Sequence, residues 1–260
     1  MGDREERAPD PRPFPFDDPL PVGSQQAPAS EIVAALAPQL TPARRHRIAR
    51  AVHYRSGQVA VVLEHVHDDG NIAAVMRSAE AFGFGRLHLV PAPESPQGRA
   101  AGRRPGRASA RVTQGADKWL EVDSWPDIGS CLTALRGEGY AIWVTALGPQ
   151  RAELSAAAGR AGAPLPAVAI VLGGERDGVS ASALALADLS VQLPMRGLAQ
   201  SFNVSVAAAL AMQELSRHRP PRYGRRQRRV LTAAYYARSV PGAEAILRQR
   251  AQHGAGGEAL

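Results

Sequence analysis

From Val59 to Leu215 the chain alternates two kinds of apolar pattern, and this alternation constrains the fold more than any other feature. Short runs such as QVAVVLEHV, YAIWVTAL and AVAIVLG are continuously apolar or alternate with a period of two, which is typical of β-strands. Between them lie runs with a helical period of 3.6, such as NIAAVMRSAEAFG and NVSVAAALAMQEL. Strands that alternate with helices predict an α/β core with a largely parallel sheet.

The composition limits what this core can be. A chain of 260 residues with 45% hydrophobic residues can bury one substantial core. No apolar run is long enough for a membrane span, and the first residues are acidic where a signal peptide would be apolar, so we expect a cytoplasmic protein without a membrane segment. Cys131 is the single cysteine, which excludes a disulfide framework and a multi-cysteine zinc site. His65 and His67 have the i, i+2 spacing that places two side chains on one side of a strand. The strand gives way to a loop at this point, so we expect no metal site.

The charge points to a polyanionic partner. The formal net charge is +7 and the isoelectric point is near 10.4, and clustered cations gain affinity by releasing the counterions of a phosphate backbone. Lys118 is the single lysine, and the guanidinium groups of arginine bind phosphate in bidentate fashion. We therefore expect nucleic acid as the partner, ahead of an anionic membrane surface. The candidate residues for this binding, which become RNA-binding candidates with the family resemblance described below, are Arg44, Arg45, Arg103, Arg104, Arg107, Arg111, Arg225 and Arg226.

The chain divides into four predicted segments. They are a proline-rich leader without regular structure, a helical RNA-binding extension, a catalytic domain and a basic C-terminal extension, at residues 1–30, 31–56, 57–218 and 219–260. In the second segment Thr41 is the expected N-cap of a helix, with Pro42 at its first position. The Gly/Pro/Arg stretch between Val90 and Lys118 is longer than ordinary connections, which predicts a functional or disordered loop.

Three motifs place polar residues next to the predicted strands. In the motif that runs from Asn71 to Arg77, both end residues lie off the apolar helical stripe and can face a cleft above the strand ends. The glycine-rich turn LGGERDGVS leaves a strand and enters a helix, and its glycines permit close approach of a ligand. The third motif, LPMRGLAQSFNVS, runs from a strand end into a helix of small residues. Taken singly, each motif is also explained by helix capping or by a strand-to-helix turn.

Taken together, the three motifs resemble the SPOUT superfamily of methyltransferases in its TrmH-like (SpoU) branch. The signatures N-x-x-A-x-x-R, G-x-E-x-x-G-(V/I)-S and (I/L)-P-M-x-G-x-x-x-S-(L/F)-N-V-S occur here in that order, and the resemblance extends from about Val59 to Arg217. It implies a trefoil-knotted α/β fold, a homodimer, S-adenosylmethionine as cofactor and 2′-O-ribose methylation of RNA. Within the branch, the chain is most similar to tRNA (guanosine-2′-O)-methyltransferases that act on the D-loop, with 23S rRNA as the alternative substrate.

The resemblance also assigns roles to residues. By its motifs, the catalytic set is Asn71, Arg77, Glu175, Ser201 and Asn203. The cofactor pocket, built from the loops of the knot, is formed by Thr145, Leu147, Gly174, Glu175, Leu193, Met195, Ser201 and Phe202. A guanidinium is normally always charged, so we expect Arg77 to stabilise the developing alkoxide rather than to act as a base.

Two other classes of function fit the sequence less well. A nucleotide-dependent α/β enzyme such as an oxidoreductase would carry a GxGxxG after the first strand or a GxxxxGKS/T loop, and the sequence has neither. A catalytically silent, basic RNA-binding protein would have no need of the polar set formed by Asn71, Arg77, Glu175 and Asn203. The enzyme is therefore the favoured interpretation.

Overall fold

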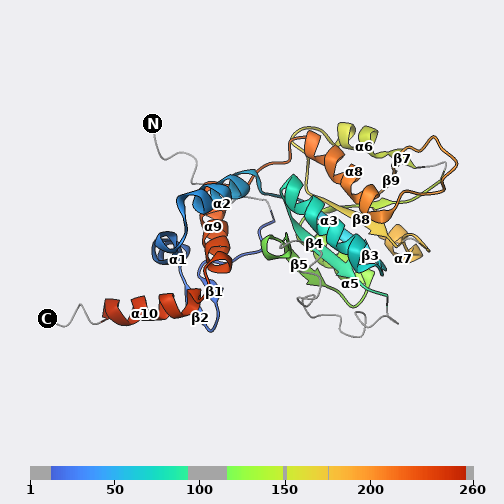
Figure 1. Ribbon diagram of the computed structural model, residues 1–260. Coiled ribbons are helices and arrows are strands. Elements are labelled where there is room, and N and C mark those ends of the chain that lie inside the picture. The colour runs from blue at the N-terminus through green and yellow to red at the C-terminus, as the bar shows by residue number, and fades with distance from the viewer. Residues whose placement is uncertain (1–12, 93–115, 149–150, 175, 256–260) are drawn as a thin grey trace. The chain divides into compact units, whose positions relative to one another are not determined.

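The computed structural model describes residues 13–92, 116–148, 151–174 and 176–255 (Figure 1). The chain forms two compact units. Residues 56–221 form the first, which we call the α/β domain, and residues 1–55 and 222–260 together form the second, which we call the helical unit. The two extensions predicted on either side of the catalytic domain therefore belong to one folded unit.

The described part of the α/β domain holds a sheet of seven strands in the order β5-β4-β3-β8-β6-β9-β7, and every neighbouring pair is parallel. This confirms the prediction of an α/β fold with a parallel sheet. The strands are β3 (Ser56–Glu64), β4 (Phe84–Val90), β5 (Glu121–Ser124), β6 (Ala141–Thr145), β7 (Ala152–Glu153), β8 (Val168–Gly173) and β9 (Leu189–Gln192).

Helices cover both faces of the sheet, which makes three layers. On one face α3 and α6 both pack against α8, and on the other α5 packs against α7 (Figure 1). These helices are α3 (Asp69–Phe82), α5 (Ile128–Gly137), α6 (Leu154–Ala161), α7 (Ala181–Ala185) and α8 (Val204–Arg217), and a 3-10 helix, η4, spans Ala116–Trp119. Because both faces are covered, the central strands are apolar throughout, which explains their continuous hydrophobic runs.

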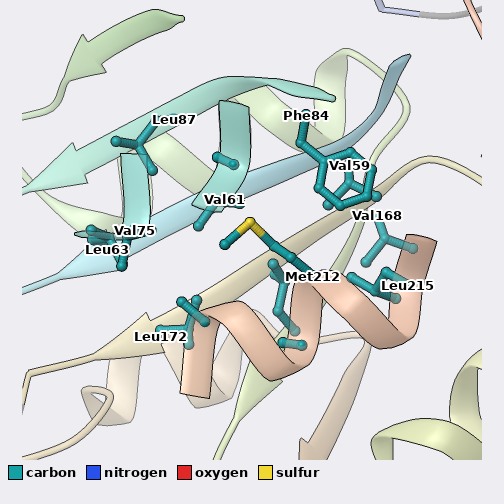
Figure 2. Packing of buried hydrophobic residues seen from close by; sticks show 14 of the residues in the cluster. Val59, Val61, Leu63, Val75, Phe84, Leu87, Val168, Leu172, Met212 and Leu215 are labelled. Atoms are coloured by element: carbon teal, nitrogen blue, oxygen red, sulfur yellow. The ribbon is translucent and has the colours of Figure 1, made fainter. Parts of the chain in front are cut away.

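Strand β3 contributes side chains to the cores on both faces of the sheet. Val59, Val61 and Leu63 lie in the core beneath α3 and α8, whereas Ala60 and Val62 lie in the core beneath α5. Successive residues of a strand point to opposite faces, so one uninterrupted apolar run supplies both. Figure 2 shows the first of these cores, with the side chains of β3, β8 and α8 gathered between the sheet and the helix.

The core beneath α5 also holds a polar cluster. The Arg86 guanidinium pairs with Glu138 and lies 5.6 Å from the ring centroid of Tyr140, whose hydroxyl donates to the carbonyl of Gly57 at 2.6 Å. Burial, with Arg86 nearby, lowers the pKa of His88 to about 3, so its ring stays neutral near neutral pH. These contacts join β3 and β4 to the chain beyond α5, away from the carboxyl ends of the strands that carry the motifs.

The helical unit contains an antiparallel hairpin and helices that pack against one another. Its helices α1 and α2 both contact α9, so segments from the two ends of the chain share one core. The elements are β1 (Leu20–Val22), β2 (Gln25–Ala27), α1 (Ala29–Leu36), the 3-10 helix η1 (Ala37–Gln39), α2 (Pro42–Tyr54), α9 (Arg225–Ser239) and α10 (Ala243–Ala255). As predicted, Thr41 caps α2, where its hydroxyl accepts from the backbone N–H of Arg44 at 3.2 Å.

The prediction that residues 1–30 have no regular structure is wrong from Leu20 onward. The hairpin turns at Gly23, whose φ is +62°, and the side chains of Leu20, Val22 and Ala27 are buried. A two-stranded hairpin consists of edge strands, which tolerate proline, so the prolines did not prevent it. Residues 1–12 lie outside the described part of the chain.

Candidate active site

A cavity of about 410 Å³ opens at the carboxyl ends of β6, β8 and β9. These three strands are neighbours in the sheet, and the carboxyl ends of parallel strands meet at one edge, where ligands of open α/β sheets bind. The loops that follow the three strands therefore converge. Their described lining residues are 145–147 and 151, 172–174 and 176–179, and 192, 193, 195 and 200–202, together with Val204 and Ala207 of α8.

The residues that the sequence assigns to a cofactor pocket lie in this one cavity wherever the structure describes them. Glu175 falls outside the described residues. The others that line the cavity are Thr145, Leu147, Gly174, Leu193, Met195, Ser201 and Phe202. Residues from three separate segments of the chain are thus brought to a common space by the strand order.

The loop after β8 is held tightly against the end of β3. Gly174 forms an isolated β-bridge with Gly178, and a Cβ atom on Gly174 would lie 2.3 Å from the carbonyl oxygen of His65. Beyond the bridge, the backbone N–H of Ser180 donates to Oε2 of the fully buried Glu64 at 2.9 Å. The glycine is therefore required by close packing, and Glu64 fastens the loop to the sheet.

Sequence analysis missed Glu64, although a signal was present. It is an acidic residue at the end of the apolar run VAVVLE, where a carboxylate needs a specific partner. The partner, Ser180, lies 116 positions further along the chain. Separately, the Thr145 hydroxyl donates to the carbonyl of Val171 at 2.9 Å, so this predicted cofactor residue also ties β6 to β8.

Two residues of the predicted catalytic set touch each other. Nδ2 of Asn203 donates to Oδ1 of Asn71 at 3.1 Å, which joins the first turn of α3 to the N-cap of α8. Asn203 uses its Oδ1 atom to accept from the backbone N–H of Ser205 at 2.9 Å. The cap of α3 is instead Asp68, which accepts from the backbone N–H of Asn71 at 2.6 Å. The side chain of Asn71 is thus left to meet Asn203.

The backbone of Arg77 lies further along α3 than that of Asn71. Arg77 is exposed on α3, six residues beyond Asn71, which corresponds to about 9 Å along a helix axis. Among the described residues, the lining of the cavity includes Ser201, Phe202 and Val204, which flank Asn203 in sequence, but none of Asn71, Arg77 and Asn203 themselves. The structure therefore joins Asn71 to Asn203 beside a loop that lines the cavity, and Arg77 is exposed further along the same helix.

Charged residues that sequence analysis did not assign also line the cavity. Arg176 and Asp177 belong to the glycine-rich turn, and Arg151 comes directly before β7. The first two could have been found, because they lie inside a motif already singled out. Arg151 lies outside every motif, and only the position of β7 beside β9 brings it to the cavity.

The candidate RNA-binding residues divide between described and undescribed segments. Arg44 and Arg45 lie in the first turn of α2, and Arg225 and Arg226 lie in the first turn of α9. The remaining candidates, Arg103, Arg104, Arg107 and Arg111, lie outside the described residues.

The net charge resides in the helical unit alone. Residues 56–221 contain fifteen Lys and Arg residues and fifteen Asp and Glu residues, so the α/β domain has no formal net charge. The whole formal charge of +7 belongs to residues 1–55 and 222–260. The unit that carries Arg44, Arg45, Arg225 and Arg226 is therefore the electrostatic partner for a polyanion.

Two other kinds of site are absent from the described residues. In the part of the chain that the structure describes, no helix combines the length and the apolar character that a membrane crossing requires. Over the same ranges, no three His, Cys, Asp or Glu side chains are grouped so that they could hold a metal ion.

Comparison with known proteins covers the region that forms the cavity. Residues 58–213 match the SpoU rRNA Methylase family. The tRNA (guanosine(18)-2′-O)-methyltransferase of Thermus thermophilus is 33% identical over 179 residues, which are 69% of this chain and 84% of that enzyme. The enzyme of the same name from Escherichia coli is 32% identical over 180 residues, 69% of this chain and 72% of its own.

A solved structure gives the same fold. The crystal structure of the A. aeolicus TrmH/SpoU tRNA modifying enzyme aligns with a TM-score of 0.64 and 22% identity, over 76% of this chain and 98% of that one. The likeness extends over nearly the whole of that chain and concerns the fold alone.

We expect Gly174→Ala to weaken cofactor binding, because the added Cβ would meet the carbonyl oxygen of His65. Overpacking of this kind costs about 1–3 kcal/mol of folding stability, which the loop relieves by shifting away from His65. Cofactor binding must then restore the loop against this strain, so the dissociation constant for S-adenosylmethionine should rise by about tenfold. The matched control is Gly197→Ala in the loop after β9, where an added Cβ would have no heavy atom within 4 Å. Isothermal calorimetry measures both, and equal affinity of the two variants would contradict the packing argument.

Proposed function

The chain belongs to the SpoU rRNA Methylase family, and on this premise we propose that it methylates the 2′-oxygen of a guanosine in the D-loop of tRNA. It is an S-adenosylmethionine-dependent RNA 2′-O-methyltransferase. The observation that carries the choice of substrate is the 33% identity over 84% of a tRNA (guanosine(18)-2′-O)-methyltransferase. We place the reaction in the cytoplasm, where tRNA is found.

The cavity fits the cofactor. Its volume of about 410 Å³ lies within the range of pockets that take small molecules and cofactors. Leu172, Leu193 and Phe202 offer apolar walls for an adenine ring, and Arg151 and Asp177 offer charges opposite to those of a carboxylate and an ammonium group. S-adenosylmethionine supplies the methyl group that is transferred.

The residues of the chain do the work of positioning. Asn71 and Asn203 are hydrogen-bonded to each other, and Asn203 directly follows the lining residues Ser201 and Phe202, so both amides are oriented before substrate binds. In this proposal they orient the ribose, and Ser201 shapes the wall that ribose and cofactor share. Glu175, in the glycine-rich turn, is also part of the proposed catalytic set. Because alignment of the reacting atoms accounts for much of the rate of a methyl transfer, a preformed amide pair is suited to this task.

Arg77 acts on the charge that develops at the 2′-oxygen. A guanidinium only donates hydrogen bonds, so in this proposal Arg77 stabilises the developing alkoxide, and the hydroxyl proton passes to solvent water as the methyl group is transferred. Its exposed position on α3 leaves it accessible to an RNA strand that approaches the end of the helix bearing Asn71. A phosphate of the bound RNA then orients the planar group.

We further propose that the chain is knotted at this edge. Strand β9 returns to lie between β6 and β7, and the loops after β6, β8 and β9 all meet at the cavity. A chain that passes through one of these loops on its way into α8 would form the trefoil knot that the resemblance implies.

The protein works as a homodimer in this proposal, and α8 offers the surface. Val206 and Leu210 are four residues apart on α8 and are 46% and 38% exposed, so they form an apolar stripe on the outside of the domain. Phe202, which is 37% exposed, lies directly before the N-cap of the same helix. Phe202 also lines the cavity. A second copy that covered the stripe would therefore lie next to the cofactor and the amide pair.

The substrate is tested by methyl transfer to unmodified transcripts. We expect tritiated methyl groups to be incorporated into tRNA at one D-loop guanosine, located by nuclease digestion and mass spectrometry. The control transcript carries a 2′-deoxy sugar at that guanosine and should accept no methyl group there. Transfer to 23S rRNA fragments with none to tRNA would overturn the choice of substrate.

Replacing Arg77 separates chemistry from cofactor binding. Removal of one oxyanion donor typically costs about 10²–10³ in kcat, so Arg77→Ala should lose at least this much while calorimetry shows normal S-adenosylmethionine affinity. Arg77→Lys should rescue little, because it loses the planar fork. Asn203→Ala should reduce both affinity and rate. Arg160→Ala, an exposed arginine on α6, is the control. Near-normal transfer by Arg77→Ala would remove this residue from the mechanism.

The dimer is tested on the stripe of α8. Val206→Asp should give a monomer in sedimentation, since a carboxylate in an apolar interface costs more free energy than the contact returns. Thr133→Asp places the same charge on an exposed position of α5, on the other face of the sheet, and should leave the dimer intact. A monomeric wild-type protein would contradict the assembly itself.

A further inference from the structure

A cluster of cations lies where the end of α2 meets the start of α9, within the helical unit. Nη1 of Arg222 lies 2.7 Å from Nε2 of His53, and Nη1 of Arg228 lies 3.3 Å from Nδ1 of the same ring. Both ring nitrogens of one exposed histidine thus face a guanidinium. We call these three side chains the His53 cluster.

The hydrogen bonds of the His53 cluster cannot all be made within it. A guanidinium only donates, and a neutral imidazole has one accepting nitrogen and one N–H. If Nε2 accepts from Arg222, Nδ1 carries a hydrogen and faces the donor of Arg228. In at least one of the two contacts, an N–H of the ring therefore faces an N–H of a guanidinium, and no hydrogen bond forms there. An acceptor from outside, with several oxygens and a negative charge, would satisfy the ring N–H and both guanidinium groups.

The cluster is held in place by contacts that use no anion. The guanidinium of Arg222 lies over the ring of Tyr54, 4.5 Å from its centroid, a cation–π arrangement. The backbone N–H of Tyr223 donates to the carbonyl of Arg55 at 3.3 Å, and the N–H of Gly224 donates to Oε1 of Gln227 at 3.0 Å. These bonds fix the chain that enters α9 against the end of α2, so the cations are positioned in advance.

The surroundings do not neutralise these cations. Among the described residues, no carboxylate lies within ion-pair distance of Arg222 or Arg228. Residues 13–55 and 222–255 together contain thirteen arginines and four acidic residues. Cations are kept close together here at an electrostatic cost, which a bound anion would remove.

We propose that the His53 cluster is a binding site for a backbone phosphodiester of the RNA substrate. Phosphate oxygens accept from Arg222, from Arg228 and from the ring N–H of His53, which completes the hydrogen bonds that the cluster lacks. The site deepens the proposed function, because its ligand is the RNA that the α/β domain methylates. The sequence already pointed to the basic tail that contains Arg222 and Arg228, and the structure adds His53 and places the three side chains together.

The first test compares two double variants with equal loss of charge. Arg222→Gln/Arg228→Gln removes both guanidinium groups of the His53 cluster. Arg47→Gln/Arg250→Gln removes two exposed arginines of the same unit that lie outside the cluster. Fluorescence anisotropy with labelled, unmodified tRNA should show affinity lower by about tenfold for the first variant than for the second. Its plot of log affinity against log salt should also be shallower by about one. Equal losses in the two variants would overturn the site.

Two further measurements make the result specific. Circular dichroism and S-adenosylmethionine affinity should be unchanged in both variants. Histidine-selective NMR, with His53→Gln to assign the signal, should show the His53 ring shifting as RNA is added. Inorganic phosphate at the same concentration should leave the signal in place. A full shift with inorganic phosphate alone would assign the site to a free anion and contradict the proposal.

The outcome is independent of the methyl-transfer assay. If the cluster variant loses RNA affinity but the wild-type protein methylates no tRNA, the choice of substrate fails and the phosphodiester site stands. If tRNA is methylated and the two double variants bind it alike, the substrate stands and the site fails.

Discussion

The parallel pairing of β8 between β3 and β6 is the constraint on which the rest of the α/β domain depends. In this register Glu64 lies beside Gly173, and Val144 lies beside Val171. A shift of one residue would exchange the two faces of a buried strand and disrupt both cores. The same register sets the loop after β8 against the end of β3, where Glu64 holds the N–H of Ser180. The hydrophobic packing of the sheet thus determines the shape of the cavity.

The two units divide the physical work. The α/β domain has no formal net charge, although its cavity contains charged side chains of both signs. The helical unit carries the whole excess of +7. Attraction to a polyanion is long-ranged and depends on salt, whereas methyl transfer depends on the placement of a few atoms.

Capping and the proposed catalytic role belong to the same residue in the third motif, which explains why that motif alone was ambiguous. Asn203 accepts backbone N–H groups of α8 with Oδ1 and donates to Asn71 with Nδ2. A side-chain amide has both an acceptor and two donors, so it can end a helix and still present a polar group to a partner. The structural and the functional interpretations of that motif are therefore compatible. The sequence around Asn203 does not show this second contact, because the partner, Asn71, lies on another helix.

The sequence by itself determined the parallel α/β sheet, the helix that begins after Thr41 and the three segments that meet at the cavity. The sheet follows from local periodicity and the helix start from its capping residues, whereas the three pocket segments follow from the resemblance of the motifs to a known family. Only the tertiary structure decided that Asn71 meets Asn203 across 132 residues, that Arg151 reaches the cavity, and that both ends of the chain form one unit. Local patterns report which side of a strand or helix a residue faces, whereas such contacts depend on strand order and on packing between distant segments.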